Sequence, residues 1–221
     1  MLLAVTGLRR EARIVESDDM TTISSGGNQP SLTQQIAIAL RGTARGVVSF
    51  GIAGALAPAL MPGDCVVASH IIDGSEIIAC DAKWLKAIVS WLPDAHVAAI
   101  AGSRTILADV DAKAALHRRT GAAAVDMESH IAARAARDHG LPFVAVRTIS
   151  DGADHTLPPA ALVALKPDGR IDFPALARSL LAQPAQIPGL IRTARESERA
   201  FAALFRCRSL LGPSLAFPYL G

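Results

Sequence analysis

Aromatic residues are scarce in this sequence, at 4% of 221 residues, and its three cysteines are widely spaced and odd in number. That cysteine pattern excludes both a disulfide framework and a cysteine-rich metal box. The net charge of +2 is too small for a general nucleic-acid-binding protein. No apolar run reaches the ~20 residues that a membrane span requires. Charged residues 9–11 interrupt the apolar start too early for a signal peptide, so we expect a cytoplasmic globular protein.

Small apolar residues are abundant in the sequence. Hydrophobic residues make up 51% of the chain, the mean hydropathy is +0.33, and 221 residues suffice for one large core. The richness in Ala, Gly, Val and Ile suits a tightly packed α/β sheet. The composition therefore predicts an α/β protein.

One stretch, residues 125–154, organises the rest of the chain. Apolar residues at helical spacing predict a helix after Glu128, which Gly140 and Pro142 end. The β-branched and aromatic run from Phe143 to Ile149 predicts a buried strand, with Asp151 at or just past its C-terminal end. Open α/β sheets place their ligand sites at such ends, so the carboxylates of Glu128 and Asp151 are expected to face one crevice.

The sequence Asp126-Met127-Glu128, followed by Val146-Arg147-Thr148-Ile149-Ser150-Asp151, resembles the paired signature of the purine nucleoside phosphorylase and methylthioadenosine nucleosidase superfamily. The alternative is that Glu128 caps the helix start and Asp151 opens a turn. The resemblance implies a single three-layer αβα domain over residues 1–221, with a central mixed twisted sheet. It also implies no metal or organic cofactor, with inorganic phosphate as the co-substrate if the reaction is phosphorolysis.

The loop expected at residues 7–13, after an apolar strand from Leu2 to Thr6, is a second point of resemblance. Nucleosidases hold an acid there that activates water; Glu11 matches it, with Leu8 as an apolar contact. Phosphorylases instead use this loop to bind phosphate, which here implies Gly7 and Arg9. The next turn, with Ser25, Gly26 and Gly27, resembles a family turn that holds an anion or a ribose hydroxyl; a flexible surface loop is the alternative.

Two further segments resemble the parts of the family that contact the nucleoside. The exit of the strand at 46–50 resembles a glycine turn touching purine and ribose or phosphate, which implies the residues Gly51, Ile52, Ala53 and Gly54. Ile52 stands where many relatives carry a hydroxyl, which weakens the phosphate-binding alternative. The segment at 106–111 resembles the part that packs over the base, with Val110 chosen as the contact beside Ile106 and Leu107.

The chemistry of the reaction gives the matched residues their expected roles. Asp151 would protonate N7 of the departing purine, with Ser150 to orient it. Glu128 would accept hydrogen bonds from the ribose hydroxyls as positive charge develops on the sugar, above an apolar floor formed by Met127. Arg147 is expected to pair with a buried carboxylate.

The C-terminal segment, residues 173–221, is expected to be helical with an apolar tail. A helix starting at Asp172 or Phe173 is interrupted near Pro184 and Pro188, and a long helix continues to Leu211. The tail at 215–220 is unusually apolar. We expect it to dock on the core or on a second subunit, with peripheral membrane contact as the alternative.

Taken whole, the chain most resembles a bacterial branch associated with hopanoid biosynthesis, whose members are implicated in removing adenine from adenosylhopane. The resemblance implies a small-molecule or lipid-linked adenine nucleoside as substrate, no nucleic acid, and a homo-oligomer. A methylthioadenosine or S-adenosylhomocysteine nucleosidase is the alternative enzyme. A non-catalytic nucleoside-binding protein is a third interpretation, against which the presence of both Glu128 and Asp151 counts.

Overall fold

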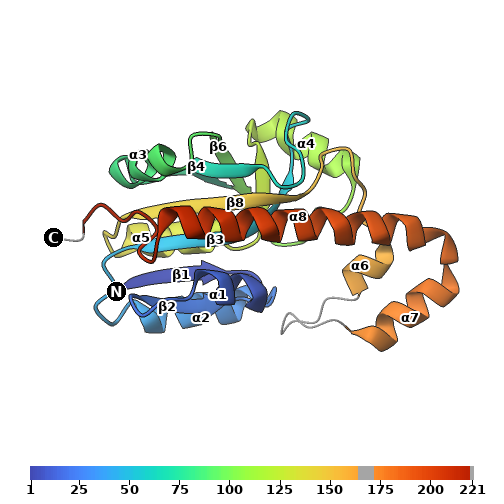
Figure 1. Cartoon of the computed structure of the whole chain (residues 1–221), viewed down its shortest axis with the longest axis horizontal. Helices are drawn as coiled ribbons and strands as arrows, with labels where there is room; N and C mark the ends of the chain where they lie inside the picture. The colour runs from blue at the N-terminus through green and yellow to red at the C-terminus, as the bar shows by residue number, and fades with distance from the viewer. Residues whose placement is uncertain (164–171, 220–221) are drawn as a thin grey trace.

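A computed structural model describes residues 1–163 and 172–219 (Figure 1). The strands are β1 Leu2–Thr6, β2 Met20–Ser24, β3 Val47–Ala55, β4 Cys65–Asp73, β5 Glu76–Ala79, β6 His96–Gly102, β7 Ala124–Asp126 and β8 Phe143–Asp151. The helices are α1 Arg9–Val15, α2 Gln29–Ala39, α3 Ala82–Trp91, α4 Val110–Thr120, α5 Ser129–Asp138, α6 Pro159–Val163, α7 Phe173–Ala182 and α8 Ile187–Leu211, with a 3-10 turn at Pro184–Gln186.

The strands form one mixed sheet in the order β2-β1-β3-β7-β6-β4-β5. The remaining strand, β8, pairs in parallel with β3 and antiparallel with β4. Because β3 and β4 are also linked through β7 and β6, these five strands close into a ring. The expected mixed α/β architecture is confirmed, and the closed ring is a feature that the sequence did not reveal.

Both faces of the sheet are covered by helices, since the central strands are buried on both sides. On β8, Val144 and Val146 pack in a cluster that includes residues of α3 and α8. The alternate residues Ala145 and Ile149 pack in another cluster with α2 and α5. This period-two division of an almost continuous apolar run is what a doubly covered strand requires. Figure 1 shows α8 running along β8 and β3 across the front of the molecule.

Two local expectations were wrong. Residues 7–13 are not all loop, because α1 begins at Arg9; the Glu11 carboxylate accepts the backbone N–H groups of Gly7 and Leu8 and so satisfies free donors at the helix start. The strand expected at 46–50 continues through the glycine turn to Ala55, since parallel pairing with β8 extends that far. The predicted ligand-contacting residues 51–54 thus lie on a strand.

The C-terminal segment follows the sequence closely. Asp172 caps α7 by accepting the N–H of Ala175, and Pro188 lies in the first turn of α8. The tail docks on the core: Phe217 is 5% exposed and its ring lies 4.7 Å from that of Trp84. Residues 220 and 221 of the expected tail lie outside the described residues. No helix within the described ranges is long and apolar enough to cross a membrane.

We expect Phe217→Ala to lower the free energy of unfolding by about 3–5 kcal/mol, the usual cost of removing a buried phenyl ring. Its ring contacts Trp84, and a Cβ at Gly46 would stand only 2.8 Å from it. Urea denaturation measures the loss. Phe205→Ala is the matched control, since that ring is 60% exposed and should change stability by no more than about 0.5 kcal/mol. Equal small losses in both variants would show that the tail does not stabilise the core.

Candidate active site

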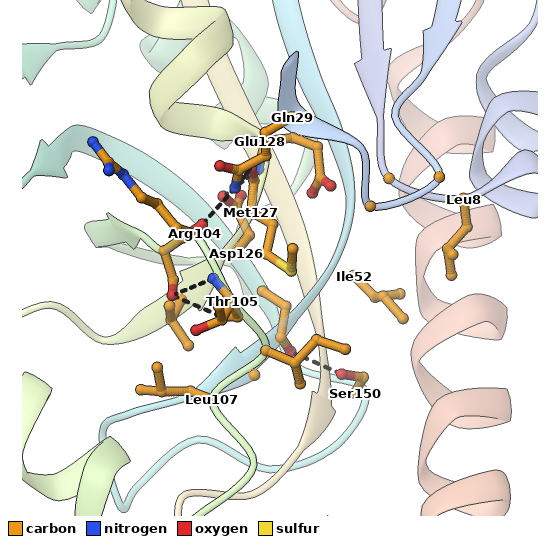
Figure 2. Close-up of a pocket in the computed structure, with 18 of the residues that line it drawn as sticks. Leu8, Gln29, Ile52, Arg104, Thr105, Leu107, Asp126, Met127, Glu128 and Ser150 are labelled. Carbon is orange, nitrogen blue, oxygen red and sulfur yellow. Dashed lines mark hydrogen bonds between the residues drawn. The ribbon is translucent and has the colours of Figure 1, made fainter. Parts of the chain in front are cut away.

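A cavity of about 680 Å³ opens at the carboxyl ends of β1, β2, β3, β6 and β8 (Figure 2). It is lined by Gly7, Leu8, Glu11, Gly26, Gly27, Asn28, Gln29, Pro30, Ile52, Ala53, Gly54, Ser103, Arg104, Thr105, Ile106, Leu107, Val125, Asp126, Met127, Glu128, Ser150, Asp151, Leu157 and Leu162. In Figure 2, Leu8 and Ile52 lie on one side of the view, Arg104 and Leu107 on the other, and Met127 between them. The crevice expected between Glu128 and Asp151 is therefore present.

Glu128 lies at the start of α5 but does not cap it. Asp126 does so, because its Oδ1 accepts the N–H groups of Glu128 and Ser129 at 3.2 and 2.9 Å. The Glu128 carboxylate instead accepts a hydrogen bond of 2.7 Å from Ser25 Oγ and faces Gly7, where a Cβ would stand 3.1 Å from both of its oxygens. The capping alternative is thus wrong, and Glu128 is free to serve the cavity.

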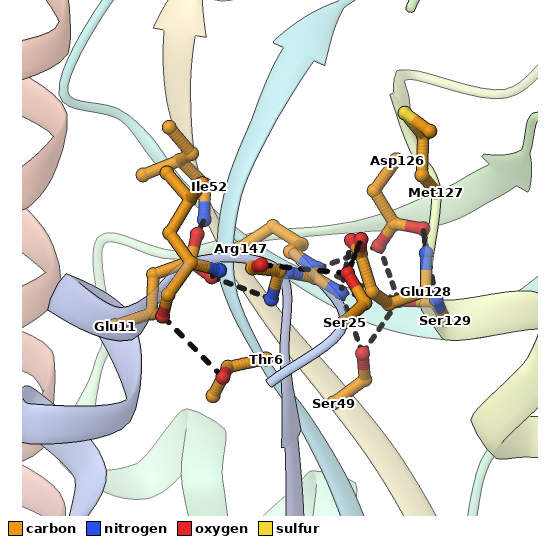
Figure 3. A network of polar contacts seen from close by, with 12 residues as sticks. Thr6, Glu11, Ser25, Ser49, Ile52, Asp126, Met127, Glu128, Ser129 and Arg147 are labelled. Atoms are coloured by element: carbon orange, nitrogen blue, oxygen red, sulfur yellow. Dashed lines mark hydrogen bonds and ion pairs between the residues drawn. The ribbon is translucent and has the colours of Figure 1, made fainter. Parts of the chain in front are cut away.

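Arg147 is a fully buried cation beneath Glu11 and Glu128. Its Nε pairs with Asp126 Oδ2 at 2.6 Å, and its Nη2 lies 3.8 Å from Glu128 Oε2 and donates to Ser49 Oγ at 2.5 Å. Its Nη1 has no hydrogen-bond partner in the described part of the chain. Figure 3 shows Arg147 between Glu11 on one side and Asp126 and Glu128 on the other. The predicted pairing of Arg147 with a buried carboxylate is confirmed.

Glu11 is held rigidly beside Arg147. Its Oε2 accepts from the N–H groups of Gly7 and Leu8 at 2.6 and 2.7 Å, and its Oε1 from the N–H of Ile52 at 2.8 Å. Burial raises the pKa of Glu11, and the Arg147 guanidinium opposes that rise. Only glycine fits at position 51, since a Cβ there would meet Arg147 Nη1 at 2.4 Å and Glu11 Oε1 at 2.5 Å. Gly51 thus lies behind the cavity, where it lets the two side chains meet.

Asp151 ends β8, lines the cavity and is 6% exposed. Ser150 Oγ donates to its Oδ1 at 2.6 Å, as expected for an orienting residue. Its other oxygen, Oδ2, accepts from Lys113 Nζ at 2.6 Å. Lys113 belongs to α4 and was not among the expected site residues. Its sequence signal is weak: only its spacing from buried Leu116 sets it on the inner face of α4.

The structure corrects three expected contacts besides that of Gly51, which does not line the cavity. Val110 lies in the first turn of α4 and is not among the lining residues, whereas Ile106 and Leu107 line the cavity. Arg9 is exposed at the start of α1 and does not line the cavity, because the helix turns its side chain to solvent. Ser25 does not line it either; it supports Glu128 from behind. Sequence position alone did not show on which side of the backbone these residues would lie.

Other expected contacts lie at the cavity. Gly7, Leu8, Gly26 and Gly27 line it at the ends of β1 and β2. Gln29 was not anticipated; its amide nitrogen donates to the carbonyls of Ser103, after β6, and Met127, after β7, and so ties these two segments together. No cluster of three or more His, Cys, Asp or Glu in the described ranges is placed to hold a metal ion.

Burial raises the pKa of Glu128 from 4.5 to about 7; Asp126 and Glu11 add to the rise, and Arg147 and Ser25 oppose it. The folded state therefore binds more protons than the unfolded chain between these values, so this group's contribution to stability is full below about 4.5 and is lost as pH rises through 7. We expect the free energy of unfolding of Glu128→Gln, relative to that of wild type, to be about 1–3 kcal/mol higher at pH 8 than at pH 5. Urea denaturation at the two pH values measures the difference.

The control is Glu16→Gln, an exposed glutamate that follows α1. Its effect on the free energy of unfolding should not change between pH 5 and pH 8. An equally constant effect for Glu128→Gln would contradict a raised pKa in the folded state.

Solved structures with the same fold include two nucleosidases and a futalosine hydrolase. The methylthioadenosine/S-adenosylhomocysteine nucleosidase of Neisseria meningitidis, in complex with methylthio-immucillin-A, is 16% identical with a TM-score of 0.71; the alignment covers 97% of this chain and 99% of that one. The enzyme of the same name from Colwellia psychrerythraea, in complex with adenine, is 19% identical with a TM-score of 0.65, over 83% and 95% of the chains. A futalosine hydrolase mutant of Helicobacter pylori is 15% identical with a TM-score of 0.58, over 67% and 89%.

At sequence identities of 15–19%, these similarities establish the fold alone. No curated protein matches the sequence. The Phosphorylase superfamily matches over residues 14–181, which include Glu128, Arg147 and Asp151 but not Glu11. Because that match spans most of the chain, the protein belongs to the Phosphorylase superfamily.

Proposed function

We propose that this protein cleaves the N-glycosidic bond of an adenine nucleoside in the cytoplasm, by hydrolysis. The observation that carries the proposal is the arrangement of three buried carboxylates: Glu128 and Asp151 face one cavity from different strand ends, and Glu11 lies at its base. The adenine and nucleoside analogues in the related nucleosidase structures support adenine as the base. The reaction as proposed needs no metal or organic cofactor.

In this proposal, Glu128 and Met127 bind the ribose. As an anion, Glu128 accepts hydrogen bonds from the 2′- and 3′-hydroxyls, and these strengthen as the ribose becomes cationic. Ser25 holds Oε1 at 2.7 Å and so fixes the carboxylate before substrate binds. Met127, whose carbonyl is tied to Gln29, supplies an apolar surface beside it. Asp151, oriented by Ser150, meets the base and transfers a proton to N7, so that adenine leaves neutral.

The residues at the bottom of the cavity favour water over phosphate as the nucleophile. Glu11 has a raised pKa, as suits a general base, and its carboxylate lies beside Arg147 Nη1, a buried donor with no hydrogen-bond partner among the described residues. A water molecule between them would satisfy that donor and be activated by Glu11. Arg9, the cation expected to bind phosphate, is exposed and away from the cavity. The glycine turn at 26–27 remains available for phosphate in the alternative, phosphorolytic reaction.

For the substrate we propose adenosylhopane, a lipid-linked adenine nucleoside. Apolar side chains line the cavity from several elements, among them Leu8, Ile52, Leu157 and Leu162. Leu162 belongs to α6, which packs on α7, and these helices expose Val163, Phe173 and Leu181 at 50%, 69% and 83%. An apolar 5′ group can thus leave the cavity next to an apolar surface. We place the peripheral membrane contact at α6 and α7, since the tail is docked on the core.

Methylthioadenosine and S-adenosylhomocysteine, which the names of the related enzymes contain, are the alternative substrates.

We also propose a homo-oligomer, since exposed apolar residues such as Ile38 and Trp91, at 57% and 59%, remain for contact with a second subunit. Sedimentation at high protein concentration tests it, and a monomer alone would contradict it.

The test is incubation of purified protein with adenosylhopane, with and without phosphate, while adenine and the sugar product are followed. Release of adenine and a free ribosyl product in both buffers would support hydrolysis. Release only with phosphate, giving the sugar 1-phosphate, would replace hydrolysis with phosphorolysis. Release from methylthioadenosine but not from the lipid would overturn the substrate, and no release from any adenine nucleoside would overturn the function.

A further inference from the structure

Lys113 is fully buried, and all three N–H groups of its ammonium donate hydrogen bonds to residues at the end of β8 and in the loop that follows. Nζ donates to Asp151 Oδ2 at 2.6 Å, to the Gly152 carbonyl at 2.9 Å and to the His155 carbonyl at 2.8 Å. An ammonium group has three donors, so this one is saturated. Lysines are rarely buried without such pairing, and this lysine is paired with the candidate acid rather than with a structural carboxylate.

The local structure explains how Lys113 reaches the site. Asp109 caps α4 by accepting the N–H groups of Asp111 and Ala112, and the N–H of Leu157 donates to the carbonyl of Ala108 just before the helix. The first turn of α4 is thus tied to the loop that follows β8. Lys113, in that turn, extends to the start of the same loop.

The loop itself is anchored from the far side. His155 Nδ1 lies 2.6 Å from Glu196 Oε2 on α8, and both side chains are buried. The His155 carbonyl, one of the acceptors of Lys113, is therefore held in place by a second element. Lys113, Asp151 and His155 form one rigid unit at the end of β8.

The contacts of Asp151 divide between its two oxygens. Oδ2 receives the ammonium of Lys113 and Oδ1 the hydroxyl of Ser150. Protonation of a departing purine at N7 requires a proton at this carboxylate. Both donors lie 2.6 Å from the carboxylate oxygens, and the ammonium, being a cation, gives up a proton far more readily than the serine hydroxyl.

We propose that Lys113 acts through Asp151 as its positioning residue and as the source of the proton that Asp151 passes to the base. This inference rests on the proposed function. As the N-glycosidic bond breaks, its electron pair goes to the purine; Lys113 Nζ gives a proton to the Asp151 carboxylate, which passes it on to N7. The site is left with a neutral amine and a carboxylate. Solvent returns the proton after adenine leaves, while the proton of the attacking water departs through Glu11, so protons balance over the cycle.

The test compares two leaving groups. Adenine must be protonated to leave well, whereas 4-nitrophenolate leaves as a stable anion. We expect Lys113→Met to lower kcat for adenine release at least ~100-fold, the usual scale for loss of general acid catalysis, with KM little changed. Hydrolysis of 4-nitrophenyl riboside by the same variant should stay within a few-fold of wild type. A lysine that only holds the loop in place would, when replaced, slow both substrates alike, and that result would overturn the proposal.

Three further variants make the experiment decisive. Lys86→Met, at an exposed lysine of α3, is the matched control and should change neither rate. Lys113→Met combined with Asp151→Asn should release adenine no more slowly than Asp151→Asn alone, because both act in one proton transfer. If Lys113→Met does not fold, Lys113→Arg retains the cation but holds its protons too firmly to give one up, and should show the same selective loss. Full adenine release by Lys113→Arg would overturn the proton transfer.

Product release by the wild-type enzyme distinguishes failure of this inference from failure of the proposed function. Wild-type release of both adenine and 4-nitrophenol, with equal slowing of both in Lys113→Met, would overturn the role of Lys113 alone. Release of neither product by wild type would overturn the proposed function and this inference together.

Discussion

Asp151→Asn is expected to lower the rate of adenine release at least ~100-fold, with nucleoside binding retained. Asparagine keeps an oxygen that can accept from Lys113 and an outline close to that of the aspartate, but it cannot give a proton to N7. The change should therefore fall on kcat far more than on KM. Steady-state kinetics with an adenine nucleoside, together with calorimetric titration of the nucleoside, measures both quantities.

The matched control for this prediction is Asp154→Asn, three residues further along the same loop. Its side chain is 82% exposed and lies 3.7 Å from Arg192, so no catalytic loss is expected. Thermal denaturation of both variants separates a loss of activity from a loss of folding. Unchanged turnover in folded Asp151→Asn would show that the carboxylate is not the acid, and would favour a protein that binds the nucleoside without cleaving it.

The convergence of Glu128 and Asp151 could be predicted from the sequence because it depends on local features. Glu128 comes directly before a helix that the apolar spacing predicts, and Asp151 ends the predicted strand β8, where open α/β sheets place their ligand sites. The division of α7 from α8 was equally readable, since prolines fix where helices begin and end. The docking of the tail followed from its apolar residues.

Lys113 could not be predicted in the same way. It is 38 residues from Asp151 along the chain, and a lysine on a helix is read by default as a solvated residue. The ring of five strands could not be predicted for a similar reason: the residues that pair between β4 and β8 are 79 to 83 positions apart, and a periodic apolar pattern does not identify a strand's partners. The side-chain directions of Arg9 and Val110 depended on where α1 and α4 begin, which is the least certain feature of a sequence pattern.

Arg147→Met should cause the largest loss of stability in this site, about 3–5 kcal/mol, because it leaves buried carboxylates without their cation. Arg147 is fully buried, pairs with Asp126 at 2.6 Å and lies 3.8 Å from Glu128. Methionine matches much of the side chain's length, so lost packing contributes little. Arg134→Met is the matched control: Arg134 is about half exposed and pairs with Asp73 at the surface, where such pairs contribute less than about 1 kcal/mol.

The pH dependence distinguishes lost charge from lost shape. Burial raises the pKa values of Glu128 and Glu11, and Arg147 holds both down. Without Arg147 both rise further in the folded state, so stability falls more steeply as pH increases, and protonation at low pH relieves the unpaired charges. Urea denaturation should show a larger deficit at pH 8 than at pH 5 for Arg147→Met and a constant small one for Arg134→Met. A deficit equal at both pH values would mean that the guanidinium fills space here rather than neutralising the buried carboxylates of Glu128 and Glu11.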